Sequence, residues 1–278
     1  MALTVNTNVA SLTAQRNLAS TQGALSTSLQ RLSSGLRVNS AKDDAAGMFS
    51  IERMTADIRG LNQAVRNAQD GISLAQTGEG SMGQIQTALQ RICEIAVQSS
   101  NATVEDRTGL QSEVDQLTQE ISRIVTTTEF NGSKLLDGTT SSLVFQIGAD
   151  GDASNQITVT GVDLTGINAY SATLTATGTV DVSTATAASA VISNMDDDID
   201  AVSAERATFG AVQNRFEAVV VNLTSYSENL SSARGRLQDA DFAAETANLT
   251  RAQILQQAGV AMLAQANTLP QSALALLQ

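Results

Sequence analysis

Histidine and tryptophan are absent from this sequence of 278 residues, which contains one proline, Pro270, and one cysteine, Cys93. Without histidine the chain lacks the most frequent general base and metal ligand of enzymes. A single cysteine excludes an internal disulfide framework. Aromatic residues make up only 3 % of the chain, so few bulky groups are present to fill a globular centre. These scarcities favour long helices packed through aliphatic side chains over a compact enzyme.

Two further absences limit the kinds of partner. No run of about 18 apolar residues occurs, so the sequence predicts no membrane-spanning helix. The net charge of −12 disfavours nucleic acid, whose phosphates it would repel. The N-terminus lacks the apolar core of a cleavable secretory signal. Residues 1–42, with four basic residues and no acid, match the composition of an organellar transit peptide, but their regular leucine period favours a structural helix.

An apolar period of 3.5 residues runs from Phe209 to Leu237. This pattern is typical of a helix that keeps one stripe turned toward partner helices. We predict that this helix provides the central seam of a bundle. The seam residues are Phe209, Val212, Phe216, Val219, Leu223, Tyr226, Leu230 and Leu237.

Similar stripes lie at both ends of the chain. They comprise Leu18, Leu25, Leu29, Leu32 and Leu36 near the start, and Leu249, Leu255, Ala258, Met262 and Leu269 near the end. The first segment is basic, whereas the last holds three acids and only Arg251 as a base, so charge favours their pairing. We expect these stripes to be buried against each other or against other molecules, because no internal domain covers them.

The segment between these ends predicts further helices. One begins after the acidic caps Asp43 and Asp44 and extends to about Ser99. Glycines at 78, 80 and 83 each cost about 1 kcal/mol relative to alanine, so propensity predicts a break there. A third seam is formed by Leu110, Val114, Leu117, Ile121 and Ile124. Helices of matching period predict an intramolecular antiparallel bundle.

The helical pattern stops at the turn dipeptides Asn131-Gly132 and Asp137-Gly138. Residues 143–147 and 156–162 are rich in β-forming side chains and flank a Gly/Asp loop, which predicts a β-hairpin. Residues 163–188 consist mainly of Thr, Ala, Ser and Gly. We predict short strands and loop there, forming the most exposed part of the chain, with helix resuming near Val191.

The acidic clusters do not match a calcium loop. Ala207 stands at the position of the twelfth-place glutamate counted from Asp196, and Gly161 stands there counted from Asp150. Cys93 has no imidazole to activate it. The sequence therefore predicts no catalytic, metal or cofactor site.

Five segments of the chain resemble the terminal regions of bacterial flagellins. They are residues 32–47 (LSSGLRVNSAKDDAAG), 130–132 (FNG), 251–259 (RAQILQQAG), 6–8 (NTN) and 263–267 (LAQAN). Their order and spacing match the family over about residues 1–165 and 190–278. The centre is too short for the additional outer domains of larger flagellins.

Together the periodicities and the resemblance predict a mainly α protein, a long coiled-coil-like helical bundle with a small β-hairpin region. We expect an N-terminal inner-core helix and connector over 1–43 and a rod-like bundle over 44–238, with its hairpin region at about 139–188. A C-terminal inner-core helix over 239–278 would pair with the N-terminal one.

The resemblance implies a structural subunit that polymerises with copies of itself into the extracellular flagellar filament for motility. It further implies unfolded export through the flagellar type III apparatus, an export chaperone at the C-terminal helix, and contacts with cap and junction proteins. We expect the terminal helices to be disordered in the monomer and to fold on assembly. A hook–filament junction protein and a coiled-coil adaptor that never polymerises are the alternatives.

One surface is predicted from the resemblance residue by residue. Gln90, Arg91, Glu94 and Ile95 match the segment that flagellin-sensing toll-like receptors read, and Glu113 matches a further contact. Ile95 replaces the usual leucine. Arg91 and Glu94 also form an ordinary i, i+3 pair on a helix surface. The adjacent subunit would cover the same patch in a filament, so assembly is its expected native role.

Overall fold

The computed structural model describes residues 7–275, with side chains described as far as Thr268. Within this part of the chain five α-helices account for most of the structure: α1 (Val9–Ser34), α2 (Ala45–Ser99), α3 (Thr108–Thr127), α4 (Ala185–Gln238) and α5 (Phe242–Ala275). Two small antiparallel sheets pair β1 (Glu129–Phe130) with β2 (Ser133–Lys134) and β3 (Leu143–Gln146) with β4 (Gln156–Val159), and a short 3-10 helix, η1 (Ala153–Asn155), precedes β4. The predicted mainly α fold is confirmed.

The chain divides into two compact units. Unit 1 contains the residues up to Ile58 and those from Glu228 onward, so it includes α1, α5, the start of α2 and the end of α4. Unit 2 contains Arg59–Ser227. The boundaries predicted at residues 43/44 and 238/239 concern the assembled filament and stay a prediction.

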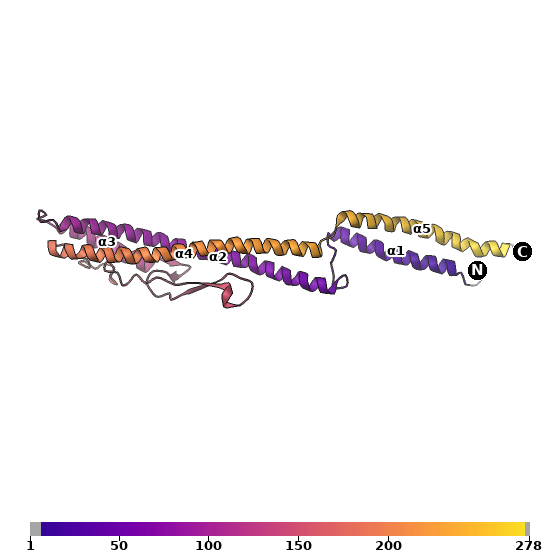
Figure 1. Ribbon diagram of the computed structural model, residues 1–278, viewed down its shortest axis with the longest axis horizontal. Helices are drawn as coiled ribbons and strands as arrows, with labels where there is room; N and C mark the ends of the chain where they lie inside the picture. Colours follow the sequence, from indigo (N-terminus) through magenta and orange to yellow (C-terminus); the bar gives the residue numbers. More distant parts are fainter. Residues whose placement is uncertain (1–6, 276–278) are drawn as a thin grey trace. The chain divides into compact units, whose positions relative to one another are not determined.

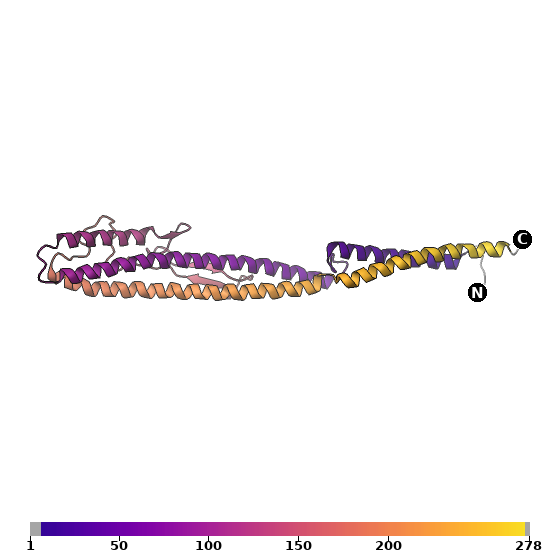
Figure 2. The same cartoon turned by 90° about the horizontal axis from the view of Figure 1, so that it is seen from above.

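In unit 1, α1 and α5 run antiparallel and lie side by side (Figures 1 and 2). The Asn8 side chain caps α1 by accepting a hydrogen bond from Ser11 N at 3.1 Å. The helix ends where Gly35 adopts a left-handed conformation, φ 72°, and donates to Arg31 O at 2.8 Å. Glycine is the residue that takes this cap without strain. The predicted end near residues 33–35 is confirmed.

Acidic side chains start α2 as predicted. Asp44 Oδ1 accepts a hydrogen bond from Gly47 N at 2.8 Å, the geometry of a helix N-cap. Asp43 Oδ2 accepts from the Ser40 hydroxyl and from the backbone N–H groups of Asn39 and Ser40, which closes the preceding turn and lowers the pKa of Asp43.

In unit 2, α2 continues through its glycine cluster, so the predicted break is wrong. A Cβ on Gly78 would lie 2.6 Å from Cε1 of Phe209, and one on Gly71 would lie 2.5 Å from Cζ of Phe216. The glycines therefore make room for two rings of α4. Both rings are buried, and the packing of such large side chains outweighs the helix-propensity cost of the glycines.

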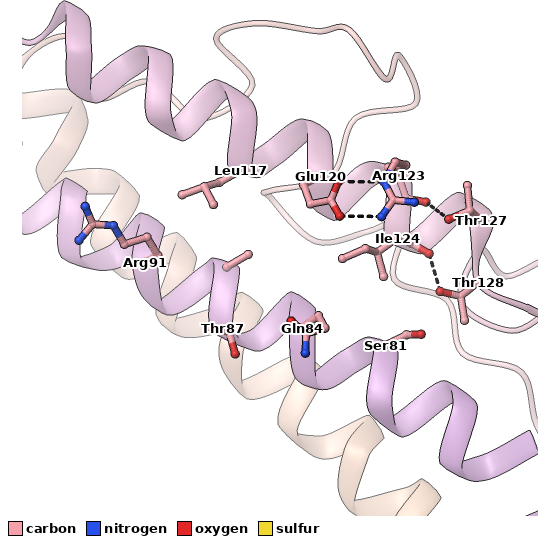
Figure 3. A pocket seen from close by; sticks show the side chains of 11 residues that line it. Ser81, Gln84, Thr87, Arg91, Leu117, Glu120, Arg123, Ile124, Thr127 and Thr128 are labelled. Carbon is pink, nitrogen blue, oxygen red and sulfur yellow. Dashed lines mark hydrogen bonds and ion pairs between the residues drawn. The ribbon is translucent and has the colours of Figure 1, made fainter. Parts of the chain in front are cut away.

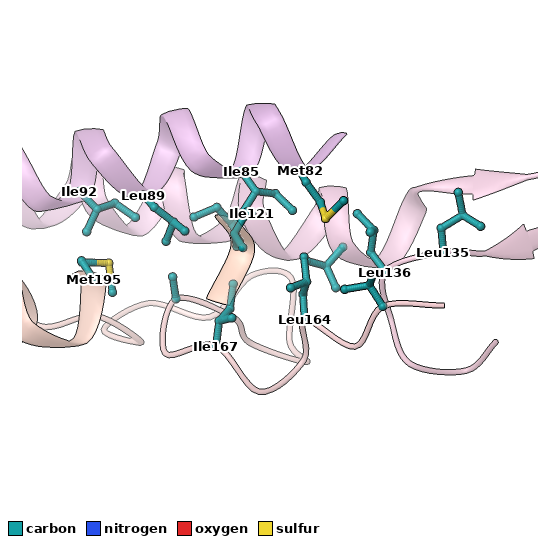
Figure 4. Packing of buried hydrophobic residues seen from close by; sticks show 14 of the residues in the cluster. Met82, Ile85, Leu89, Ile92, Ile121, Leu135, Leu136, Leu164, Ile167 and Met195 are labelled. Carbon is teal, nitrogen blue, oxygen red and sulfur yellow. The ribbon is translucent and has the colours of Figure 1, made fainter. Parts of the chain in front are cut away.

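The core of unit 2 lies between α2, α3, α4 and the loops beside them (Figure 4). Ile85, Leu89 and Ile92 of α2 face Ile121 of α3 and Met195 of α4 in this cluster. Phe145 of β3 meets Phe216 edge to face, with ring centroids 5.4 Å apart. The three-helix bundle predicted from the periodicities is present in this unit.

The loop between β4 and α4 corrects another prediction. Leu164, Ala169 and Val182 are at most 2 % exposed and belong to the core, so residues 163–184 are not the most exposed part of the chain. No strand forms in them beyond the isolated bridge between Asp137 and Asp163. Helix α4 begins at Ala185 rather than near Val191.

Side chains of α3 hold this loop by its main chain. Gln111 donates to Val180 O at 2.9 Å and accepts from Val182 N at 2.7 Å. One and two turns further along, Asp115 accepts from Gly178 N at 2.8 Å and Gln119 donates to Ala176 O at 3.1 Å. The main-chain groups of the loop thereby find partners although the segment forms no sheet.

The predicted hairpin is confirmed, with Leu143 opposite Val159 and Gln146 opposite Gln156. The turn at Asn131-Gly132 joins β1 to β2, and both residues have positive φ, 49° and 80°. Asn-Gly is the dipeptide that favours such a hairpin turn.

Candidate assembly surfaces

The contact between α1 and α5 sets leucines against small residues. A Cβ on Gly259 would lie 3.3 Å from Cδ1 and 4.0 Å from Cβ of Leu18, so the two backbones approach closely at this level. The buried residues of the contact include Ser11 and Ser28 of α1 and Ala252 and Ala266 of α5, all small. Such a contact removes little apolar area from water for the length of the helices.

Eight large apolar side chains of this helix pair are at least half exposed. Between 50 % and 64 % of each of the following side chains is exposed: Val9, Leu12, Leu29, Phe242, Ile254, Leu255, Val260 and Met262. A groove of about 600 Å³ lies open between the helices, lined mainly by apolar groups from Val9 to Leu18 and from Leu255 to Met262.

The stripe residues predicted from the sequence fall into two groups, one half-buried and one exposed. Leu18, Leu25, Leu32, Leu36 and Leu249 are half-buried. Leu29, Leu255, Ala258 and Met262 are exposed. The side chain of Leu269 lies outside the described residues. Periodicity therefore located the stripes, but it did not indicate which members the partner helix covers.

The seam residues of α4 also differ from one another in burial. Phe209 and Phe216 are buried in unit 2, and Tyr226 is 52 % exposed. The other seam residues are half-buried, namely Val212, Val219, Leu223, Leu230 and Leu237.

Polar contacts tie both ends of the α1–α5 pair. At the start of α1, Asn8 Nδ2 donates to Ala266 O at 2.8 Å. At its end, Ala240 N donates to Gly35 O at 2.9 Å, and Arg37 N donates to Gln238 O at 2.7 Å. A polar groove of about 460 Å³ lies beside the latter end and contains Arg31, Glu245 and Arg251. The sequence analysis did not predict Asn8 and Arg31 as contact residues of the pair. Two features of the sequence indicate them: an Asn directly before a helix and a charge beside an apolar stripe.

The residues of the predicted receptor or inter-subunit surface lie on unit 2, with one correction, and their role stays a prediction. Arg91 joins α2 to α3, donating from Nε to Glu113 Oε1 at 2.8 Å and from Nη1 to Glu94 Oε2 at 2.9 Å. Gln90 is exposed on the same helix. Ile95 is fully buried in the core of unit 2 and cannot contact a partner here. Four of the five predicted residues therefore share this surface.

A groove of about 570 Å³ continues from this surface between α2 and α3 (Figure 3). Ala88, Leu117 and Ile124 supply its apolar lining, and the ion pair of Glu120 with Arg123, 2.6 Å, lies at its edge. Both charged side chains are about half exposed, so their pairing contributes little to stability.

The single thiol is not placed for chemistry. Cys93 is half-buried, and burial raises its pKa, with the negative charges of Asp196 and Glu94 acting in the same direction. A raised pKa reduces the thiolate fraction, which is the reactive form. Among the described residues, no three His, Cys, Asp or Glu side chains gather as metal ligands. No helix in that part of the chain has the length and apolar content needed to cross a bilayer.

Comparisons with known proteins match both ends of the chain. The family described as bacterial flagellin N-terminal helical region matches residues 5–141, and the bacterial flagellin C-terminal helical region matches residues 192–277. The chain is 45 % identical over 276 residues to the flagellin of Halalkalibacterium halodurans, covering 99 % of both chains. The chain belongs to the bacterial flagellin family.

Further flagellins agree with this assignment. The chain is 41 % identical to the flagellin of Bacillus subtilis strain 168, with 99 % of each chain covered. The crystal structure of Bacillus cereus flagellin is similar at a TM-score of 0.50 and 31 % identity, covering 61 % of this chain and 94 % of that one. The two family regions leave out residues 142–191, which contain the β3–β4 hairpin and the loop held by α3.

Membership of this family gives the chain its role. It is a structural subunit of the bacterial flagellar filament, and flagellins polymerise with copies of themselves outside the cell. The family is structural rather than enzymatic.

Proposed function

We propose that α1 and α5 form the part of this subunit that lies buried between copies in the filament, and that both helices become ordered during assembly. The exposed apolar side chains of the pair carry this proposal. Groups such as Leu12, Ile254 and Met262 are more than half exposed on helices that otherwise make only a thin mutual contact. An apolar face of this extent is characteristic of a surface that other molecules cover.

Copies of the same chain are the partner that this face fits best. We expect its exposed apolar groups, which lie on both helices, to meet a different surface of the next copy. Contacts of this kind repeat without closing and produce a helical filament. Part of the contact free energy is used to order the terminal helices, which keeps the free subunit soluble until it meets a growing end.

Truncation tests this proposal. Chains lacking residues 1–35 or 243–278 should fail to extend filament seeds, because each deletion removes one helix of the pair. The helical circular dichroism of residues 45–235 should persist, since unit 2 contains its own core. A deletion inside the exposed loop at residues 149–152, remote from α1 and α5 in sequence, is the matched control and should leave seeded growth intact. Seeded growth by either truncated chain would contradict the proposal.

The apolar face of α5 and the charged patch on α2 and α3 support the predictions of specific protein partners. We propose that an export chaperone covers the apolar face of α5 before assembly, during export through the flagellar type III apparatus, and that cap and junction proteins meet the subunit ends. The patch of Gln90, Arg91, Glu94 and Glu113 supports contact with a neighbouring subunit and with a flagellin-sensing toll-like receptor. We further propose that the chain has no catalytic role and no cofactor.

A further inference from the structure

Helices α1 and α5 contain very few charged residues. Val9–Ser34 holds Arg16 and Arg31, and Phe242–Ala275 holds Glu245 and Arg251. Glu245 is thus the only acid in either helix. Its side chain is 10 % exposed, whereas those of most other polar residues in these helices face solvent.

Arg31 is the cation that accompanies this buried carboxylate. Its Nη1 lies 3.9 Å from Glu245 Oε2, and its Nε is buried without a hydrogen-bond partner among the described residues. Arg251 lines the same groove, but it is exposed and donates to Asn248 of its own helix at 3.2 Å. The Arg31 side chain is 32 % exposed, so the buried partner is the Glu245 carboxylate. Separating the two leaves this buried charge uncompensated, which disfavours such an arrangement.

The apolar contacts alone do not define how α1 and α5 align. Leu18, Leu25 and Leu32 are spaced by seven residues, as are Ala252, Gly259 and Ala266 of the partner helix. Leu18 lies against Gly259. Sliding the helices by one heptad would set Leu18 against Ala266, Leu25 against Gly259 and Leu32 against Ala252, so each of these leucines would meet a small residue. The slipped alignment moves Glu245 about two turns away from Arg31 and breaks the bond from Asn8 to Ala266 O.

We propose that the Arg31–Glu245 ion pair selects the register and the partner of α1 and α5 as these helices order. The inference rests on the proposed function, since ordering on assembly brings α1 of one copy close to α5 of several copies. Pairing of α1 with another α1 would bring together arginines only. The main-chain bonds of Gly35 and Arg37 hold the base of the pair and the bond from Asn8 to Ala266 O holds its other end, and the ion pair adds selection by charge within the helices.

Disulfide trapping in seeded filaments tests this selection. All chains carry Cys93→Ser. The native-register reporter adds Leu18→Cys and Gly259→Cys, whose Cβ atoms would lie 4.0 Å apart, a separation suited to a disulfide. The slipped-register reporter adds Leu25→Cys and Gly259→Cys. After oxidation, non-reducing electrophoresis separates links within a chain from dimers, and mass spectrometry identifies the linked cysteines.

With native charges, the first reporter should link within the chain and the second should not. Arg31→Gln or Glu245→Gln should lower the ratio of native to slipped links about tenfold or more and produce dimers, because the buried charge no longer favours one register. The exchanged variant Arg31→Glu with Glu245→Arg should restore the native links. Arg251→Gln is the matched control and should leave them unchanged.

Unaltered links in both glutamine variants would overturn the inference while leaving the proposed function intact. If the glutamine variants do not assemble, the exchanged variant decides: recovered growth with native links supports the inference, and continued failure overturns it. Native-charge reporter chains that never extend seeds under reducing conditions would contradict the proposed function itself, and the inference would fall with it.

Discussion

At the scale of single residues, two neighbouring glycines of α2 have different surroundings. Gly78 lies under the buried ring of Phe209, whereas Gly80 is exposed and has no atom within 4 Å of the place where a Cβ would stand. Gly78→Ala should lower the free energy of unfolding by up to about 2 kcal/mol, because an overpacking cost of ~1–3 kcal/mol outweighs a gain of about 1 kcal/mol in helix propensity. Gly80→Ala should raise it by about 1 kcal/mol. Urea unfolding followed by circular dichroism measures both, and changes of the same sign would contradict this account.

Asp198 is a second residue whose surroundings predict a measurable effect. It is 2 % exposed, and its carboxylate accepts hydrogen bonds from Asn168 N and Nδ2, both at 2.8 Å, and from Ala169 N at 2.9 Å. Burial raises the pKa of Asp198, the hydrogen bonds from Asn168 and Ala169 oppose the rise, and the charge of Asp197 adds to it. Its neighbours on α4 include Asp196 and Asp200, and Asp196 is close enough to Cys93 of α2 for its charge to act on the thiol.

The direction of this shift determines the sign of the pH dependence. A folded-state pKa above the unfolded value means that the folded chain binds the proton more readily. The stabilisation is fully present below the unfolded pKa, about 3.9, and is lost as the pH rises through the raised folded pKa. Asp198→Asn removes this titration. The stability of the unmodified chain relative to the variant should therefore increase as the pH falls from 7 toward 4, measured by urea unfolding. Parallel pH profiles would show that burial of Asp198 has no such effect.

At the scale of elements, the local periodicities predicted the helices well. The leucine stripe of α1 and the seams of α3 and α4 each depend on residues within a few turns, so the sequence alone carries their signal. The hairpin of β3 and β4 was predictable for the same reason, since β-rich runs flank a Gly/Asp loop. Element ends were predictable where a residue has a local role, such as Gly35 at the end of α1 and Asp44 at the start of α2.

The failures at this scale come from partners that are distant in sequence. Gly78 belongs to the cluster at which propensity predicts a break, but Phe209, more than 120 residues away, fills the space above it, as Phe216 does above Gly71. The loop over residues 163–184 appeared exposed because its side chains are small and polar. Its main chain is held by Gln111, Asp115 and Gln119, which no local pattern connects with it. Ile95 was misplaced because a family segment was transferred without testing which side of α2 each residue occupies.

At the scale of the whole molecule, the two units differ in how completely they bury their apolar residues. Unit 2 has a closed core that includes the large side chains Leu89, Ile121 and Phe216. In unit 1 the buried apolar residues of α1 and α5 are the alanines Ala252 and Ala266, and many of the large apolar groups are half exposed or more. The sequence predicted the stripes of both units, but their burial in a filament depends on other copies and could not follow from one chain.

Point substitutions on the exposed face of α5 separate assembly from the stability of the single chain. Ile254→Gln and Met262→Gln replace side chains that are 60 % and 64 % exposed, so the free energy of unfolding of the monomer, measured in urea, should stay within about 0.5 kcal/mol of the original. Burying each group between copies would contribute roughly 1.5–3 kcal/mol, so the critical concentration for seeded growth should rise about tenfold or more for each. Gln257→Asn, on an exposed polar position of the same helix, is the control and should change neither quantity. Sedimentation of filaments at graded subunit concentrations measures the effect, and an unchanged critical concentration in both variants would mean that this face of α5 stays in contact with water in the filament.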